Sequence, residues 1–136
     1  SLQRIQIIKG SITNSGARPS EKVFDVVCSD GLEVDPTTHR CPDNGARVNI
    51  EDCSITNNVG ATELKATWRD PDFNPKDKAF YYVRVLENPT CRWSTWDALK
   101  AGIKPRSDLH KTIQERAWSS PIWYIPVPED IDIFAL

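Results

Sequence analysis

The sequence predicts a mainly β protein, an antiparallel two-sheet sandwich of immunoglobulin-like shape with one short helix near residues 94–102. Two observations predict this class. Short β-branched and aromatic segments recur along the 136 residues, and turn residues rather than helices separate them. Only one segment, STWDALKAG at 94–102, has a helical pattern, with Ser94 and Asp97 as a capping box and Gly102 suited to the position after the last turn.

The expected strands follow one another along the chain at 5–8, 21–28, 46–55, 61–70, 79–87, 112–118 and 121–127. AFYYVRVLE, at 79–87, carries apolar side chains on both faces, so we expect it at the centre of a sheet. In 61–70, Leu64, Ala66 and Trp68 alternate with polar residues, which is the pattern of a half-buried strand. We expect one domain over 1–127 and a C-terminal tail at 128–136 that is an edge strand, a docking strip or frayed.

The cysteines predict disulfides. The chain has 4 cysteines and 2 histidines, and no two cysteines form a C-x-x-C pair, so a zinc site is disfavoured. Free buried thiols are the alternative. Of the three ways to form two bridges, we favour Cys28–Cys41, which closes a loop rich in turn residues, with Cys53–Cys91, which ties the middle of the chain to the segment before the helix. Two disulfides indicate an oxidising compartment, either the periplasm or the outside of the cell.

Charge and composition exclude several classes of function. The formal net charge is −2 and the basic residues are scattered, so no nucleic-acid footprint is expected. No apolar run is long enough to span a membrane, and the chain does not open with a signal-peptide pattern. Since methionine is absent, we expect translation to start upstream of Ser1. No glycine-rich phosphate loop or nucleophile motif is found, so we assign no catalytic residue and no cofactor.

One short motif resembles the start of a calcium loop. Asp70, Asp72 and Asn74 have the spacing of its first ligands, but Pro75 stands at the glycine position and Tyr81 where the bidentate glutamate belongs. The pattern favours a solvated turn, and we predict no metal site.

Tryptophan and arginine concentrate around the helix and the final strands, which is the composition of an interface. Our candidates for contact with a partner domain are Arg92, Trp93, Trp96, Glu115, Arg116 and Trp118. Glu115 and Arg116 are neighbours on an expected strand and therefore face opposite sides, so they do not form a catalytic pair. We expect Glu115 to form a structural ion pair with Arg84 or Arg92.

Three stretches resemble one known family: RIQIIKG at 4–10, VGATELKATWRDPDFNPKDKAFYYVRVLENPTCRWSTWDALKAG at 59–102, and TIQERAWSSPIWY at 112–124. It is the bacterial family catalogued as domain of unknown function 3604, and the resemblance covers nearly the whole chain except the tail. The resemblance implies that full-length members are several times longer and commonly exported, with an N-terminal part similar to PHP-type metal-dependent hydrolases. It also implies a divalent metal in that part. This chain resembles only the C-terminal end and lacks the His-x-His metal motif, so no catalytic or metal residue is carried over.

The leading hypothesis is therefore a non-catalytic, C-terminal β-domain of an exported, PHP-like metal-dependent hydrolase. It would pack on the N-terminal catalytic domain of the same polypeptide and shape the mouth of its active site. A second hypothesis is a module that binds carbohydrate or another ligand through exposed tryptophans, drawn from Trp93, Trp96, Trp118 and Trp123. A third is a fragment that donates one side chain, such as Arg116 or Glu115, to the upstream active site.

Overall fold

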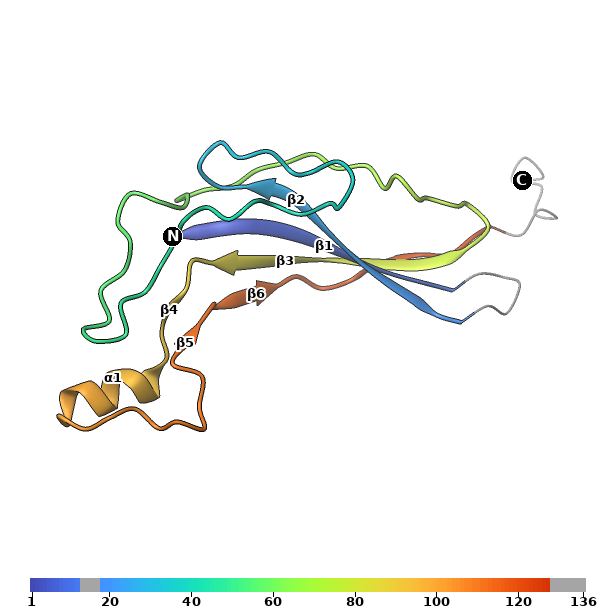
Figure 1. The fold of residues 1–136 in the computed structure, drawn as a ribbon. Helices are drawn as coiled ribbons and strands as arrows, with labels where there is room; N and C mark the ends of the chain where they lie inside the picture. The colour runs from blue at the N-terminus through green and yellow to red at the C-terminus, as the bar shows by residue number, and fades with distance from the viewer. Residues whose placement is uncertain (13–17, 128–136) are drawn as a thin grey trace.

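A five-stranded antiparallel sheet dominates the computed structural model, which describes residues 1–12 and 18–127 (Figure 1). Its strands are β1 (Leu2–Ile12), β2 (Ser20–Cys28), β3 (Lys78–Glu87), β6 (Arg116–Trp118) and β7 (Ile122–Tyr124). They lie in the order β2-β1-β3-β6. Because β6 pairs with residues 84–86 of β3 and β7 with residues 79–81, these two short strands follow one another along the same edge of β3.

A second, two-stranded sheet follows β3 in the chain. It pairs β4 (Thr90–Cys91) with β5 (Thr112–Ile113), and the helix α1 (Trp93–Lys100) lies between these strands in sequence. In Figure 1 this unit extends from the end of the main sheet at which β3 finishes. The predicted class is confirmed: the protein is mainly β, with two antiparallel sheets and one short helix.

The prediction that 79–87 is a central strand is also confirmed, because β1 pairs with one edge of β3 and β6 and β7 with the other. Its side chains alternate between two faces of the main sheet. We call the face that carries Phe80, Tyr82 and Arg84 the aromatic face, and the opposite one, which carries Tyr81, Val83 and Val85, the covered face. Directly opposed residues of antiparallel strands share a face, so the pairing registers assign the paired residues of β1, β2, β6 and β7 to one of the two.

The segment 61–70 lies over the covered face but is not a strand, so that prediction was wrong. Its backbone pairs with the sheet only at Ala61, which exchanges two hydrogen bonds with Leu2. Farther along, Trp68 packs its ring 5.2 Å from that of Phe24 and 6.3 Å from that of Tyr81. The alternation of apolar and polar residues in 61–70 therefore reflects an irregular segment that packs one side against the sheet.

The strand expected at 46–55 is reduced to a single bridge between Val48 and Ile55. Two side chains turn the chain between these residues: Asn49 accepts a hydrogen bond from the backbone N–H of Glu51, and Asp52 accepts one from Ser54. Such Asx turns compete with strand pairing.

The last two predicted strands are shorter than expected. The segment 112–118 changes partner at its middle, since β5 pairs with β4 and β6 pairs with β3. The strand expected over 121–127 is confined to β7.

The helix begins one residue earlier than expected. Arg92 stands at the N-cap position without a side-chain hydrogen bond, so Ser94 and Asp97 are helical residues and not the predicted capping box. Packing holds the helix instead: Thr95 is buried, and its hydroxyl donates to the carbonyl oxygen of Lys111 at 2.8 Å.

Both predicted disulfides are present, Cys28–Cys41 and Cys53–Cys91. The first joins the end of β2 to the loop that follows it. The second joins the loop at 46–55 to β4. Together they tie down the long excursion between β2 and β3, which carries no strand of the main sheet.

The tail at 128–136, expected to be an edge strand, a docking strip or frayed, lies outside the described residues. No helix in the described ranges has the length and apolar character needed to cross a membrane.

Candidate functional site

A polar cleft of about 550 Å³ opens where the end of the main sheet meets the loop after β2 and the start of the β5–β6 segment. Three arginines line it: Arg4 from β1, Arg47 from the loop and Arg116 from β6. We call it the arginine cleft. Arg4 and Arg116 both lie opposite Leu86 in the pairing register, so the cleft continues directly into the aromatic face.

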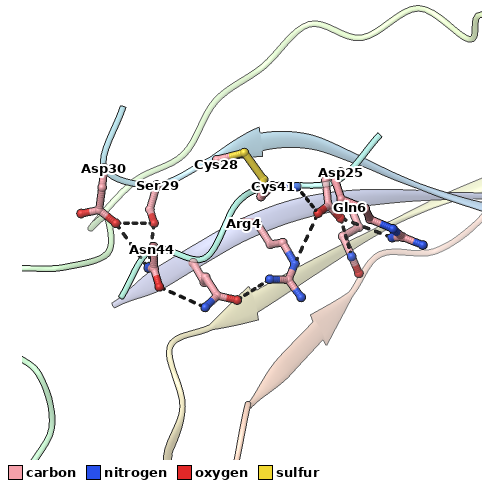
Figure 2. The surroundings of a disulfide bond; sticks show 10 residues. Arg4, Gln6, Asp25, Cys28, Ser29, Asp30, Cys41 and Asn44 are labelled. Atoms are coloured by element: carbon pink, nitrogen blue, oxygen red, sulfur yellow. Dashed lines mark hydrogen bonds and ion pairs between the residues drawn. A yellow bond between two sulfur atoms is a disulfide. The ribbon is translucent and has the colours of Figure 1, made fainter. Parts of the chain in front are cut away.

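The disulfide Cys28–Cys41 fixes the loop wall of this cleft (Figure 2). Beside it, the buried carboxylate of Asp25 accepts a hydrogen bond from the backbone N–H of Cys41 at 2.7 Å and one from the side chain of Gln6 at 2.5 Å. The backbone N–H of Asp25 in turn donates to the carbonyl oxygen of His39 at 3.0 Å. The loop is thus attached to β2 by the disulfide and by hydrogen bonds to both the side chain and the backbone of Asp25.

Asn44 links the same loop to three other segments. Its amide nitrogen donates to the hydroxyl of Ser29 at 3.1 Å and to the side-chain oxygen of Asn88 at 3.0 Å. Its side-chain oxygen accepts from Gln3 at 3.2 Å and from the backbone N–H of Ala46 at 3.1 Å. A side-chain amide with this many partners holds the cleft wall in one position, which is a requirement for a preformed site.

The three arginines differ in how many ion pairs and hydrogen bonds their guanidinium groups form within the chain. Arg47 forms a two-point ion pair with Asp43, whose pKa falls to about 2 because of hydrogen bonds from Arg47 and from the backbone N–H of Gly45. Arg4 donates to Gln3, but its buried Nε has no hydrogen-bond partner and lies 3.7 Å from Asp25. Arg116 has no ion pair or side-chain hydrogen bond within the described residues. The cleft therefore presents unsatisfied positive charge that suits a carboxylate.

The aromatic face adjoins the cleft. Its centre is a stacked pair, Phe80 and Tyr82, with ring centroids 6.4 Å apart, and Trp123 of β7 packs 5.3 Å from Phe80. Trp118 of β6 lies opposite Arg84. Trp118 and Trp123 are 60% and 68% exposed, which is unusual for side chains with so much apolar area.

Two local features set the shape of this face. The Phe80 ring lies directly over Gly10 of β1, where a Cβ atom would collide with it. Arg84 donates through its Nε to the side-chain oxygen of Gln6 at 2.7 Å and has no carboxylate partner in the described chain. The face therefore combines broad aromatic area with a guanidinium group whose charge is not neutralised.

The predicted interface residues fall into two groups. Arg116 enters the arginine cleft, and Trp118 lies beside it on the aromatic face, with Glu115 immediately before β6. Arg92, Trp93 and Trp96 belong to the start of α1, where Trp93 and Trp96 are 70% and 42% exposed. No hydrogen bond, ion pair or ring contact joins the two groups within the described residues. The ion pair expected between Glu115 and Arg84 or Arg92 does not form within the described residues, where the side chain of Arg84 donates to Gln6 instead.

Several residues of the site were not predicted, namely Arg4, Arg47, Phe80 and Tyr82 together with the hydrogen-bonding role of Asn44. Trp123 was predicted only as one of the tryptophans that could bind a ligand. Phe80, Tyr82 and Arg84 could have been found, because they alternate on one face of a strand that was recognised. Arg4 and Arg47 carry no such signal, since they come together only through the disulfide-bonded loop.

The calcium-like motif has other partners. Asp70 forms a buried ion pair with Lys9, at 2.6 Å, and accepts a hydrogen bond from Tyr81, so it is not part of a solvated turn. Asp72 pairs with Lys22, and Asn74 donates to Asp77. Residues 1–12 and 18–127 contain no group of three or more histidine, cysteine, aspartate or glutamate side chains that could hold a metal.

Comparison with known proteins identifies a family. The sequence model of a family described as "Protein of unknown function (DUF3604)" matches residues 1–126. No curated protein and no solved structure matches the chain.

Proposed function

Because this chain belongs to the DUF3604 family, we propose that it is a non-catalytic β-domain which docks on a catalytic domain of the same polypeptide. The observation that carries the proposal is the pair of exposed tryptophans, Trp118 and Trp123, on a sheet face that continues into the arginine cleft. In the complete protein, this domain lies C-terminal to a PHP-like, metal-dependent hydrolase domain of undefined substrate and shapes the mouth of its active site.

The composition of the face supports docking on a protein. Tryptophan, tyrosine and arginine are the residues that contribute most to protein–protein affinity, and they act best when surrounded by contacts that exclude water. Here Phe80 and Tyr82 lie on the central strand β3, with Trp123 and Trp118 beside them on the edge strands β7 and β6. Arg4 and Arg116 lie at one end of the face, opposite Leu86. We propose that an acidic side chain of the catalytic domain enters the cleft and pairs with Arg116.

The two disulfides indicate an oxidising environment outside the cytoplasm. We further propose that the complete protein is exported to the periplasm or beyond the cell.

The test is a titration of the separately expressed catalytic domain with this 136-residue chain, followed by calorimetry. Trp118→Ala should weaken binding at least about 30-fold, because truncating a hot-spot tryptophan costs about 2 kcal/mol or more. Trp93→Ala is the matched control: this tryptophan is as exposed but lies on α1, away from the sheet face, and its removal should leave the affinity unchanged. Absence of binding at high micromolar concentrations, or equal losses for both variants, would count against docking through this face.

A carbohydrate-binding function is a second candidate, favoured by the series of rings formed by Tyr82, Phe80 and Trp123, on which sugar rings could stack. A glycan array distinguishes it from docking: specific retention of an oligosaccharide that Trp123→Ala abolishes would support this function over the first.

The unpaired guanidinium of Arg116 favours a third candidate, in which it reaches into the upstream active site. Arg116→Lys in the full-length protein separates this role from docking. A catalytic contribution would lower kcat while the two domains remain associated, whereas docking alone would leave kcat unchanged.

A further inference from the structure

The covered face of the main sheet has a pocket of its own, of about 610 Å³, where the segment 68–73 passes over β1, β3 and β7. Five aromatic residues line it: Trp68, Phe73, Tyr81, Trp123 and Tyr124. The volume is in the range of sites that hold small molecules. The pocket opens mainly on the covered face of the sheet. Trp123 is the one lining residue that the pairing register assigns to the aromatic face, so the pocket shares only this residue with the docking surface proposed above.

The rings form walls and do not fill the space between them. Phe73 and Tyr124 meet edge to face with centroids 4.9 Å apart, and Trp68 meets Tyr81 in the same way at 6.3 Å. Three members of the lining remain strongly exposed, Phe73 at 49%, Ile122 at 73% and Trp123 at 68%. A concave, aromatic surface that stays open to solvent is the usual form of a site for an apolar molecule.

The polar groups at the pocket decide the charge of the molecule it would accept. The carboxylate of Asp70 is fully used, since it accepts from Lys9 and Tyr81 through one oxygen and from the backbone N–H of Asp72 through the other. The hydroxyl of Tyr124 donates to the carbonyl oxygen of Pro75. No free carboxylate is left for a cation, and few groups are left for the many hydroxyls of a sugar.

Arg69 is the exception. It lines the pocket, it is exposed, and its guanidinium has no hydrogen bond or ion pair in the described part of the chain. A guanidinium binds a carboxylate through two parallel hydrogen bonds. From the ring walls and this unused cation together, we propose that the pocket binds a small aromatic carboxylate, with its ring against Trp68, Phe73 and Tyr124 and its carboxylate on Arg69.

The probe for this proposal is 2-naphthoate, titrated into the 136-residue chain by calorimetry and by amide NMR. A ligand of this size in such a pocket should bind with a dissociation constant of about 1 mM or tighter. The neutral 2-naphthamide should bind about tenfold more weakly, because it lacks the charge that Arg69 would meet. Amide shifts should centre on residues 68–73 and on β7.

Two variants separate charge from shape. Arg69→Gln should remove the difference between naphthoate and naphthamide, whereas the matched change at another exposed arginine, Arg106→Gln, should preserve it. Phe73→Ala removes a half-exposed wall, which the fold tolerates, and should weaken both ligands equally.

Three results would overturn the proposal: no saturation by naphthoate up to about 10 mM, equal affinity for acid and amide in the unmodified chain, or amide shifts located elsewhere. Tighter binding of 2-naphthylmethylammonium or of a methyl glycoside would overturn it as well, since either would show that the pocket prefers a different ligand class. None of these outcomes depends on the domain docking proposed for the opposite face.

Discussion

Replacing Asp70 with asparagine should destabilise the protein severely, because it removes one member of a buried ion pair. The Nζ of Lys9 lies 2.6 Å from Asp70 Oδ2, and both side chains are less than a tenth exposed. Tyr81 donates to the same oxygen at 2.7 Å. Asparagine is close in size to aspartate but carries no charge. Lys9 would therefore lose its only anionic partner among the described residues and keep neutral ones such as the carbonyl oxygen of Asp72, at 2.8 Å, and the Tyr81 ring.

The magnitude follows from the burial. Removing one partner of a buried ion pair costs about 3–5 kcal/mol, because the remaining charge is left without compensation in a poorly solvated position. A domain of this size has a total stability of about 5–15 kcal/mol, so the change removes a large share of it. With a urea m-value of about 2 kcal/mol/M, the unfolding midpoint should fall by roughly 2 M.

The assay is equilibrium unfolding in urea near neutral pH with both disulfides intact. Asp72→Asn is a close control, because Asp72 pairs with Lys22 at a similar distance of 2.7 Å but both side chains are about half exposed. That change should cost at most about 1 kcal/mol. If Asp70→Asn cost no more than Asp72→Asn, the reasoning from burial would be refuted.

Three further predictions concern stability. Burial raises the pKa of Asp70, but hydrogen bonds from Lys9 and Tyr81 outweigh this effect and leave the pKa below its usual value. The stabilisation by the ionised carboxylate is therefore complete above pH about 4 and is lost as the pH falls through the lower pKa of the folded state. The difference in urea midpoint between the unmodified chain and Asp70→Asn should accordingly shrink below pH about 4 and not above it. Replacing Cys53 and Cys91 by alanine opens a loop with a sequence separation of 38 and should lower the stability by about 4 kcal/mol. Removing the Cys28–Cys41 bridge, with its separation of 13, should lower it by about 3 kcal/mol. If thermal unfolding showed the larger loss for Cys28–Cys41, the reasoning from loop entropy would be contradicted. Gly10→Ala should cost about 1–3 kcal/mol because the new methyl group meets the Phe80 ring, and Phe80→Leu in the same chain should recover part of this loss; additive losses in urea would argue against the contact.

A strand could be predicted from the sequence where the polarity of its side chains shows which of its faces are buried. β3 was recognised as central because both of its faces are apolar, and the disulfide pairing was inferred from the turn-rich loop that Cys28 and Cys41 close. The segment 61–70 was mistaken for a strand for a related reason. Its alternation reflects real contact with the sheet through Trp68, but alternation does not reveal whether the backbone has a partner to pair with.

The candidate site was predicted only in part. Arg116 and Trp118 were identified from composition, since aromatic residues and arginine are common at interfaces. Arg4 and Arg47 were missed because their proximity depends on how the loop folds back, and Lys9 was not connected with Asp70 because contacts between residues so distant in sequence leave no local pattern. The prediction of a solvated turn at Asp70 was wrong for the same reason: Lys9 and Tyr81, both distant in sequence, bind its carboxylate in a buried position.

The position of the two sulfur bridges has a consequence for how the chain reaches its native state. β1 and β3 pair although more than half of the polypeptide separates them in sequence, as the pairing of Ile8 with Tyr82 illustrates. Such distant pairing is slow, because the conformational entropy lost on closing the intervening loop is not compensated until the contacts form. Once oxidised, however, the end of β2 and the end of β3 are joined by a route that runs through Cys28–Cys41, the short stretch 41–53 and Cys53–Cys91. Oxidation thereby shortens the path along the chain between β2 and β3, and we expect the central sheet to assemble faster once both bridges have formed.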